Sequence, residues 1–307
     1  MAIRKLVSDF DGVWTNQKDE AEYVWNYILT SVSGLTGLST GEISDVFRKC
    51  FQEMSKEPWE YGWFYNGKIA AYYQEDPFGD NNALFDYIDR KSSNSSHSNF
   101  RQRIYEIKKA ILKKFASLSE FSQYCFVEAT TGFRREGRLK PIEKAAEIIK
   151  DLNTRGIGVV VVSNSKTDKI QHLFTKAGLK ATDEKSFKRG RLHARGGAGK
   201  FIIDNSFDQI TEQLHITQKI KINLRRPSYY NILKDELPDY VIGDVFSLDL
   251  ALPLWLILNN EKFRHMKLIQ KIQPHTPGWV IDYIVSDEIK KYVHTVNTTD
   301  EIKNIIN

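Results

Sequence analysis

The chain has 307 residues, 41% of them hydrophobic and 27% charged, which is typical of a folded protein with one large or two modest domains. A net charge of +5 is modest for this length and does not by itself indicate a nucleic-acid partner. The longest apolar stretch, 248–258, is too short to span a bilayer. The start of the chain has no signal-peptide pattern, and two cysteines do not make a disulfide framework. We therefore expect a cytoplasmic protein.

Two carboxylates, Asp9 and Asp11, follow a short apolar run near the N-terminus and precede Gly12. On a strand, residues i and i+2 point to the same face, and glycine lets the chain turn sharply away. Two acids that converge at a strand end suit a nucleophile beside an acid/base, and both can hold a hard cation. Asp and Gly are also ordinary turn residues, so this motif alone fits a solvated strand end equally well.

The segment from about 17 to about 135 is dominated by helical patterns. We expect helices over 20–43, 43–54, 81–90 and 101–115. Ser39 with Glu42 predicts an N-cap for the second of these helices. The aromatic-rich stretch 60–73 is expected to form internal core more than a substrate-stacking surface, and the polar tract 91–99 is expected to be a mobile loop.

A continuous apolar run, 156–162, ends in Ser163 and Asn164. Runs of β-branched residues are typical of strands buried on both faces of a parallel sheet. Helices predicted over 140–153 and 166–178 flank this strand, as crossover connections between parallel strands require.

A third apolar run, 239–243, repeats the design and carries two acids five residues apart, Asp244 and Asp249. Beyond it come the stretch 250–259, a helix expected over 261–270, a strand expected over 279–285 and a short helix from 299.

These three strand ends, with Asp/Asp, Ser and Asp/Asp in this order, resemble the haloacid dehalogenase-like (HAD) phosphohydrolase superfamily. The resemblance covers about 5–15 and 140–258, and not the segment between them. It implies an α/β fold with a Rossmann-like parallel sheet core, 1–16 and 136–307, flanked by helices. It also implies a mostly helical cap of the C1 type, 17–135, inserted after the first strand. A cap that excludes water would protect the reaction.

The resemblance also implies residue roles. Asp9 is similar to the family nucleophile that forms an aspartyl-phosphate, and Asp11 to the general acid/base. Dehalogenases of the superfamily lack that second acid, so a carbon–halogen substrate is disfavoured. Ser163, with Asn164 beside it, would hold a phosphoryl oxygen. The implied ligands of Mg²⁺ are Asp9, Asp11, Asp244 and Asp249.

One family element is altered. The superfamily has a Lys, often followed by Pro, about 20 residues before the fourth motif, where this chain has Arg226 and a proline. Arginine is a planar fork and not a point charge, so the exchange is not conservative. The alternative is Lys200, which ends a glycine-rich stretch whose spacing excludes a Walker A loop. We favour Arg226 for the phosphate, keep Lys200 as the alternative and Arg225 as a lesser candidate, and leave open that all three are surface charges.

The expected function is a Mg²⁺-dependent phosphohydrolase that acts on a small phosphorylated metabolite through an aspartyl-phosphate. One alternative is a phosphomutase-type phosphotransferase of the same superfamily. The other is a catalytically impaired module that binds phosphate or nucleic acid, against which the four clustered acids argue. No membrane contact is expected, and nucleic acid is the less favoured partner. Neither the substrate nor the oligomeric state can be read from the sequence.

Overall fold

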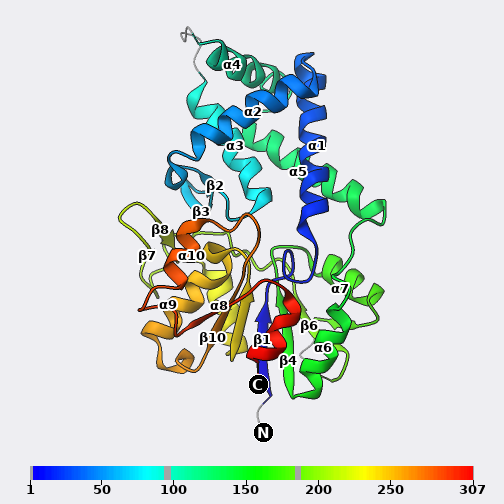
Figure 1. Cartoon of the computed structure of the whole chain (residues 1–307), viewed down its shortest axis with the longest axis vertical. Helices are drawn as coiled ribbons and strands as arrows, with labels where there is room; N and C mark the ends of the chain where they lie inside the picture. The colour runs from blue at the N-terminus through cyan, green and yellow to red at the C-terminus, as the bar shows by residue number, and fades with distance from the viewer. Residues whose placement is uncertain (1–2, 93–97, 184–187, 307) are drawn as a thin grey trace. The chain divides into compact units, whose positions relative to one another are not determined.

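The computed structural model describes residues 3–92, 98–183 and 188–306, which form two compact units (Figure 1). The first, here called the sheet unit, comprises Met1–Gln17, Tyr65–Ala70 and Lys140–Asn307. The second, here called the helical unit, comprises Lys18–Phe64 and Ala71–Leu139. No helix in the described part of the chain is long and apolar enough to cross a membrane.

A seven-stranded parallel sheet forms the centre of the sheet unit, in the order β11-β10-β9-β1-β4-β6-β5. Its strands are β1 (Arg4–Ser8), β4 (Ile157–Val162), β5 (Lys180–Thr182), β6 (Arg191–Arg195), β9 (Tyr240–Gly243), β10 (Lys267–Lys271) and β11 (Val293–Val296). The three motif-bearing strands are adjacent, with β1 between β4 and β9, and Val7 pairs with both Val160 and Val241. Because all of the strands are parallel, their carboxyl ends lie at one edge. The predicted Rossmann-like fold is confirmed.

The strands are buried as the apolar runs predict. All six residues of β4 are buried, and helix α6 (Ala145–Thr154) packs on β4 and β6 through its apolar face. Helix α7 (Thr167–Lys176) packs on β5 and β6. The remaining helices of the sheet unit are α8 (Pro227–Glu236), α9 (Ala251–Asn259), α10 (Gly278–Ile284) and the short α11 (Ile302–Ile305). A smaller antiparallel pair is formed by β7 (Gln213–His215) and β8 (Lys221–Asn223).

Two sequence predictions near the C-terminus are wrong. The strand expected over 279–285 is helix α10, in which Val280 and Ile284 are buried four residues apart, the spacing of one helix face. The helix expected over 261–270 is a single 3₁₀ turn, Glu261–Phe263, followed by strand β10. Pairing of β10 with both β9 and β11 decides its conformation, and no local pattern carries that information.

In its described residues, the inserted segment holds five α-helices and one hairpin. The helices are α1 (Gln17–Thr36), α2 (Thr40–Met54), α3 (Pro77–Lys91), α4 (Asn99–Ile111) and α5 (Leu118–Arg135), and the hairpin follows a 3₁₀ turn, Pro58–Glu60. The N-cap at Ser39 is confirmed, since Ser39 Oγ accepts from the Glu42 amide and Glu42 Oε2 accepts from the Ser39 amide. The helix predicted over 101–115 ends earlier, at Ile111, and Leu112 just beyond it is 42% exposed. The predicted mobile loop falls mainly on residues 93–97, outside the described residues.

Aromatic side chains form much of the core of the helical unit. Phe85 meets Phe47 and Phe121 edge to face, with centroid distances of 6.0 and 5.2 Å. Tyr61 and Tyr73, from the aromatic stretch of the sequence, join this core.

The hairpin in the insertion was not expected. Strands β2 (Gly62–Tyr65) and β3 (Lys68–Tyr72) are joined by Asn66 and Gly67, whose φ angles of 48° and 73° are those of a type I′ turn. The Asn-Gly pair between aromatic runs is the signal that would have predicted it. The tip of the hairpin, Tyr65–Ala70, belongs to the sheet unit.

Candidate active site

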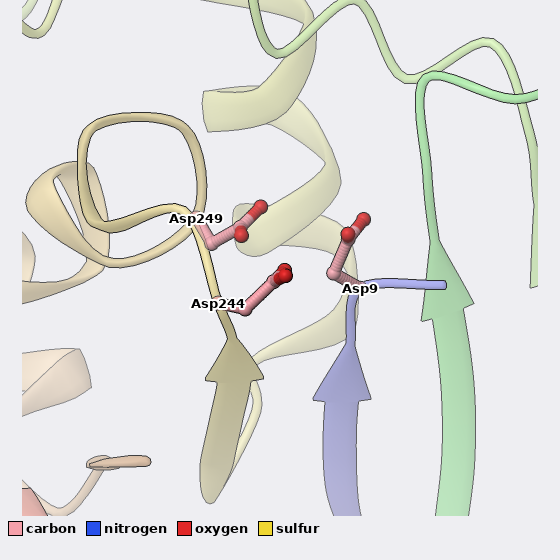
Figure 2. Close-up of side chains that lie close together, drawn as sticks. All are labelled: Asp9, Asp244 and Asp249. Atoms are coloured by element: carbon pink, nitrogen blue, oxygen red, sulfur yellow. The ribbon is translucent and has the colours of Figure 1, made fainter. Parts of the chain in front are cut away.

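Three carboxylates lie together beyond the carboxyl ends of β1 and β9. One oxygen each from Asp9, Asp244 and Asp249 lies within 4.8 Å of the others, and Figure 2 shows the three side chains converging above the strand ends. Asp244 and Asp249 are buried, and the Asp9 side chain is 12% exposed. Carboxylates this close and this buried repel one another unless cations neutralise them.

Two glycines make room for this cluster. Gly12 has φ +76°, and a Cβ at this position would overlap the Asp244 carboxylate. A Cβ at Gly243 would overlap the side chain of Asp249, which a π-helical turn, Phe246–Leu250, folds back over the strand end. Asp249 Oδ2 accepts a hydrogen bond of 3.1 Å from the Val245 amide. A side chain at either glycine would therefore push apart the carboxylates that form the cluster.

Lys200 is the cation at the centre of the cluster. Its Nζ lies 2.6 Å from Asp9 Oδ1 and 2.8 Å from Asp249 Oδ1, and its side chain is 2% exposed. The Lys200 amide donates to Asn164 Oδ1 at 2.8 Å. Burial alone would lower the pKa of Lys200, but the Asp249 and Asp9 carboxylates outweigh it and raise that pKa above its ordinary value. The ammonium is therefore charged at any physiological pH.

The nucleophile candidate has an unusual acidity. Burial raises the pKa of Asp9 to about 7; the Lys200 ammonium opposes the rise, and the charges of Asp249 and Asp11 add to it. A divalent cation among the carboxylates would reverse this balance and keep Asp9 ionised.

Asp11 stands apart from the three-carboxylate cluster. Its Oδ2 accepts a 2.7 Å hydrogen bond from Ser165 Oγ, and its Oδ1 lies 3.1 Å from Lys169 Nζ. The sequence grouped its carboxylate with the metal ligands on the rule that residues i and i+2 share a strand face. Strand β1 ends at Ser8, however, so Asp9 lies just beyond the strand and Asp11 lies in the following turn, where that rule does not apply.

Ser165 and Lys169 were missed by the sequence analysis. Ser165 follows two residues after Ser163 at the end of β4, and Lys169 lies in the first turn of α7. A second hydroxyl at a strand end, followed by a cation in the next helical turn, was the available signal.

Ser163 and Asn164 have different surroundings. Ser163 is 1% exposed, and its Oγ accepts a 3.0 Å bond from the Ser165 amide, so its hydroxyl proton can be donated to a bound oxygen. The side-chain oxygen of Asn164 holds the main chain of Lys200. Asn164 therefore orients the cation.

The hydrogen bonds described for the guanidinium groups of the two arginines in the altered motif go to main-chain carbonyls. Arg226 is wholly buried, and its guanidinium donates to the carbonyl oxygens of Asn223, Lys200 and Ala70 at 2.9, 2.6 and 2.7 Å. Arg225 is half-buried and donates to the Asn205 carbonyl at 2.8 Å. This geometry reverses the preference drawn from the sequence, because Lys200 is the cation that touches the acids.

Two more polar residues reach the cluster, from the end of β10 and the loop after it, just beyond the helix that the sequence predicted over 261–270. Lys271 Nζ donates to the Gly12 carbonyl at 2.5 Å. Gln273 Nε2 lies 3.0 Å from the same oxygen and 3.2 Å from Asp244 Oδ2. Burial lowers the pKa of Lys271, and the nearby Asp244 opposes that shift. A lysine that ends a buried strand would have been noticed had β10 been recognised.

The donor set fits a hard divalent cation. Carboxylate oxygens of Asp9, Asp244 and Asp249 converge in space, and such oxygens are the ligands that Mg²⁺ prefers. The ammonium of Lys200, which contacts Asp9 and Asp249, neutralises part of their combined charge, and a divalent ion would complete the balance.

The parallel sheet and the acidic edge define a Rossmann-like α/β protein with a site where such folds bind ligands. A family model for haloacid dehalogenase-like hydrolases matches residues 3–210, and the chain belongs to this family. The matched range contains Asp9, Asp11, Ser163 and Lys200, and ends before Asp244.

Solved structures with a similar arrangement are remote in sequence. The 2-haloacid dehalogenase of Pseudomonas syringae pv. Tomato DC3000 is 11% identical with a TM-score of 0.39, over 99% of this chain and 98% of that one. CbbY of Rhodobacter sphaeroides, in complex with phosphate, is 12% identical with a TM-score of 0.41, over 98% and 96%. A predicted phosphoglycolate phosphatase of Haemophilus somnus 129pt is 11% identical with a TM-score of 0.41, over 99% and 98%. No curated protein sequence matches the chain.

Proposed function

We propose that this HAD-like hydrolase is a Mg²⁺-dependent phosphatase that acts on a small phosphorylated metabolite through an aspartyl-phosphate at Asp9. The observation that carries the proposal is the contact of Asp9 with Lys200 inside a cluster of three carboxylates. An anionic nucleophile, a fixed cation and ligands for a hard metal are what phosphoryl transfer needs. Asp11, held by Ser165 on the adjacent turn, supplies the acid that a phosphatase requires.

In the first step, an Asp9 carboxylate oxygen attacks phosphorus while the bond from phosphorus to the leaving oxygen breaks. Asp11 gives its proton to that leaving oxygen. In the second step, Asp11 takes a proton from water as the water oxygen attacks phosphorus, and the bond between phosphorus and Asp9 breaks. The enzyme returns to its starting state with inorganic phosphate as the second product.

Two groups of residues would neutralise the negative charge of the phosphoryl group: those that bind its oxygens directly and those that hold the metal. Lys200 and the Ser163 hydroxyl would hold phosphoryl oxygens, and Asn164 keeps the main chain of Lys200 in place. Mg²⁺, held by Asp9, Asp244 and Asp249, would neutralise the charge that develops on the transferred group. Gln273, hydrogen-bonded to Asp244, orients that ligand.

We also propose that the inserted segment, with the predicted bounds 17–135, serves as a C1-type cap and carries the selectivity for the substrate. The inserted segment is mostly helical and has an aromatic core, whereas the sheet unit carries the acids at the strand ends. The proposed setting for the reaction is the cytoplasm.

The test is a screen of phosphomonoesters with purified protein and Mg²⁺, which measures release of inorganic phosphate. We expect turnover of at least one small phosphomonoester, its loss with EDTA and its absence in Asp9→Asn. A parallel measurement of halide release from 2-haloacids tests for dehalogenase activity instead. Halide release without phosphate release would overturn the proposal. Transfer of phosphate to a sugar hydroxyl in preference to water would indicate a phosphotransferase.

A further inference from the structure

Arg226 occupies the sequence position of the family's phosphate-binding lysine, but its guanidinium contacts main-chain carbonyls. It donates through Nε to Asn223 O, through Nη1 to Lys200 O and through Nη2 to Ala70 O. These carbonyls belong to three separate stretches of chain: the end of β8, the loop that carries Lys200, and strand β3 of the inserted hairpin. A wholly buried guanidinium thus joins three segments at one point.

The hairpin tip has further contacts with the same neighbourhood inside the sheet unit. The ring of Tyr65 meets that of Phe201, the residue after Lys200, edge to face with centroids 5.6 Å apart. Asn223 Nδ2 donates to Ile69 O at 3.1 Å. Lys68 Nζ lies 2.5 Å from a carboxylate oxygen of Glu212. The hairpin tip is therefore attached to the Lys200 loop, through Phe201, and to the β7–β8 region that follows it, through Glu212 and Asn223.

The chemistry of arginine explains why the residue at this position is not lysine. A guanidinium directs several N–H groups in fixed directions within one plane, so a single side chain can serve three carbonyls in different segments. A lysine ammonium is a point charge on a flexible stem and lacks that fixed fork. Each of the three bonds has a charged donor, which makes it stronger than a bond between neutral groups.

We propose that Arg226 is a positioning residue that ties the hairpin tip, Tyr65–Ala70, to the main chain of Lys200 and thereby holds the Lys200 ammonium between Asp9 and Asp249. In this arrangement the Lys200 ammonium supplies the charge beside Asp9, and Arg226 fixes the main chain that carries it. The catalytic consequence rests on the proposed function. The structural consequence is that Lys200 stays buried only while Arg226 is in place, and it is independent of the proposed function.

The decisive test measures the accessibility of single lysines. Purified protein is labelled with a small amine-reactive acylating reagent, and the rate at Lys200 is read by peptide mass spectrometry in wild type, Arg226→Lys and Arg225→Lys. Lys271, buried in the same sheet unit and outside the contacts of Arg226, is the internal reference. Arg225→Lys is the matched control. Arg225 is the neighbouring arginine, and its guanidinium donates to the Asn205 carbonyl, which is not one of the three carbonyls that bind Arg226.

We expect Arg226→Lys to raise the labelling rate of Lys200 by about tenfold or more, because the loop opens locally when charge-assisted bonds are lost. The rate at Lys271 should stay at its wild-type value, and Arg225→Lys should change neither. An unchanged Lys200 rate in Arg226→Lys would overturn the proposal. Equal acceleration at Lys200 and Lys271 would also overturn it, since that pattern indicates general destabilisation.

A second variant tests the hairpin side of the same assembly. Tyr65→Ala removes the ring that meets Phe201 and leaves Arg226 intact. We expect faster labelling of Lys200 than in wild type, by a smaller factor than in Arg226→Lys, with Lys271 unchanged. No change would show that the hairpin tip does not hold the loop.

Kinetics add the catalytic consequence once a substrate is known. Arg226→Lys should lower kcat with little change in KM, because a misplaced cation weakens the transition state more than ground-state binding. If no phosphomonoester is turned over by the wild type, the proposed function fails while the labelling result still decides the role of Arg226.

Discussion

The aromatic core of the helical unit and the acidic edge of the sheet unit are both buried, but different forces hold them. Phe47, Phe85 and Phe121 contribute by leaving water and by edge-to-face contact, which adds to stability without a special partner. Asp9 and Lys200 are buried charges, which are costly to desolvate and are tolerated because each compensates the other. We expect substitutions in the core to lower stability, and substitutions at the edge to lower activity with smaller or opposite effects on stability.

The largest effect should come from Asp9→Asn. The amide keeps the shape of the side chain but cannot attack phosphorus, so the rate of phosphate release should fall by about four orders of magnitude or more. The melting temperature of the metal-free protein should stay equal or rise, because one of three mutually repelling carboxylates is removed. Asp208→Asn, at an exposed position of the same unit, should behave as wild type. A variant that retains more than a tenth of the rate would remove Asp9 from the role of nucleophile.

On the other side of the comparison, Phe85→Ala should lower the free energy of unfolding of the helical unit by about 3–5 kcal/mol, because it leaves a cavity among packed rings. Denaturant titration followed by circular dichroism provides the measurement. Val127→Ala, at a 45% exposed position of α5, is the control and should cost less than about 0.5 kcal/mol. Similar costs for the two variants would mean that the aromatic cluster is not the structural core of this unit.

Lys200→Ala tests whether Lys200 is the cation that acts on the phosphoryl group. Loss of the ammonium should lower kcat by about two orders of magnitude, as removal of a transition-state donor does. Lys176→Ala, on the exposed part of α7, serves as the control and should keep the wild-type kcat. A near wild-type kcat for Lys200→Ala would show that another group neutralises the phosphoryl charge.

Asp244→Ala should raise the Mg²⁺ concentration needed for half-maximal activity by at least about tenfold, since a hard cation loses a charged oxygen ligand. Titration of phosphate release with Mg²⁺ measures this directly. An unchanged Mg²⁺ dependence would place the metal away from Asp244.

The stability of the metal-free protein should also change with pH. The pKa of Asp9 in the folded state is about 7, well above the value of 3.8 for a free side chain, so the folded state binds this proton more tightly. Stability should therefore fall as pH rises from about 4 to about 7, and the fall should be absent in Asp9→Asn. Thermal unfolding across this range in EDTA tests the sign, and excess Mg²⁺ should restore stability at the upper end. A wild-type profile that matches Asp9→Asn would show that Asp9 is ionised throughout.

The sequence determined those features whose signals are local. A continuous apolar run rich in β-branched residues has no polar face, so 156–162 predicts a strand buried on both faces, and β4 is one. The N-cap at Ser39 is settled by a contact three residues away. Asp9, Ser163 and Asp244 were identified as site candidates because each follows an apolar strand, and parallel strands bring their carboxyl ends to one edge.

Only the tertiary structure decided which cation meets the acids and where Asp11 points. Lys200 reaches Asp9 across 191 positions of sequence, and Arg226 reaches Ala70 across 156. No periodicity or spacing reports such contacts: the spacing to the fourth motif favoured Arg226, whereas the ion pairs with Asp9 and Asp249 belong to Lys200. The pairing depends on contacts that form only in the folded chain. The planar guanidinium of Arg226 donates to three carbonyls in different segments, and the ammonium of Lys200 contacts the carboxylates.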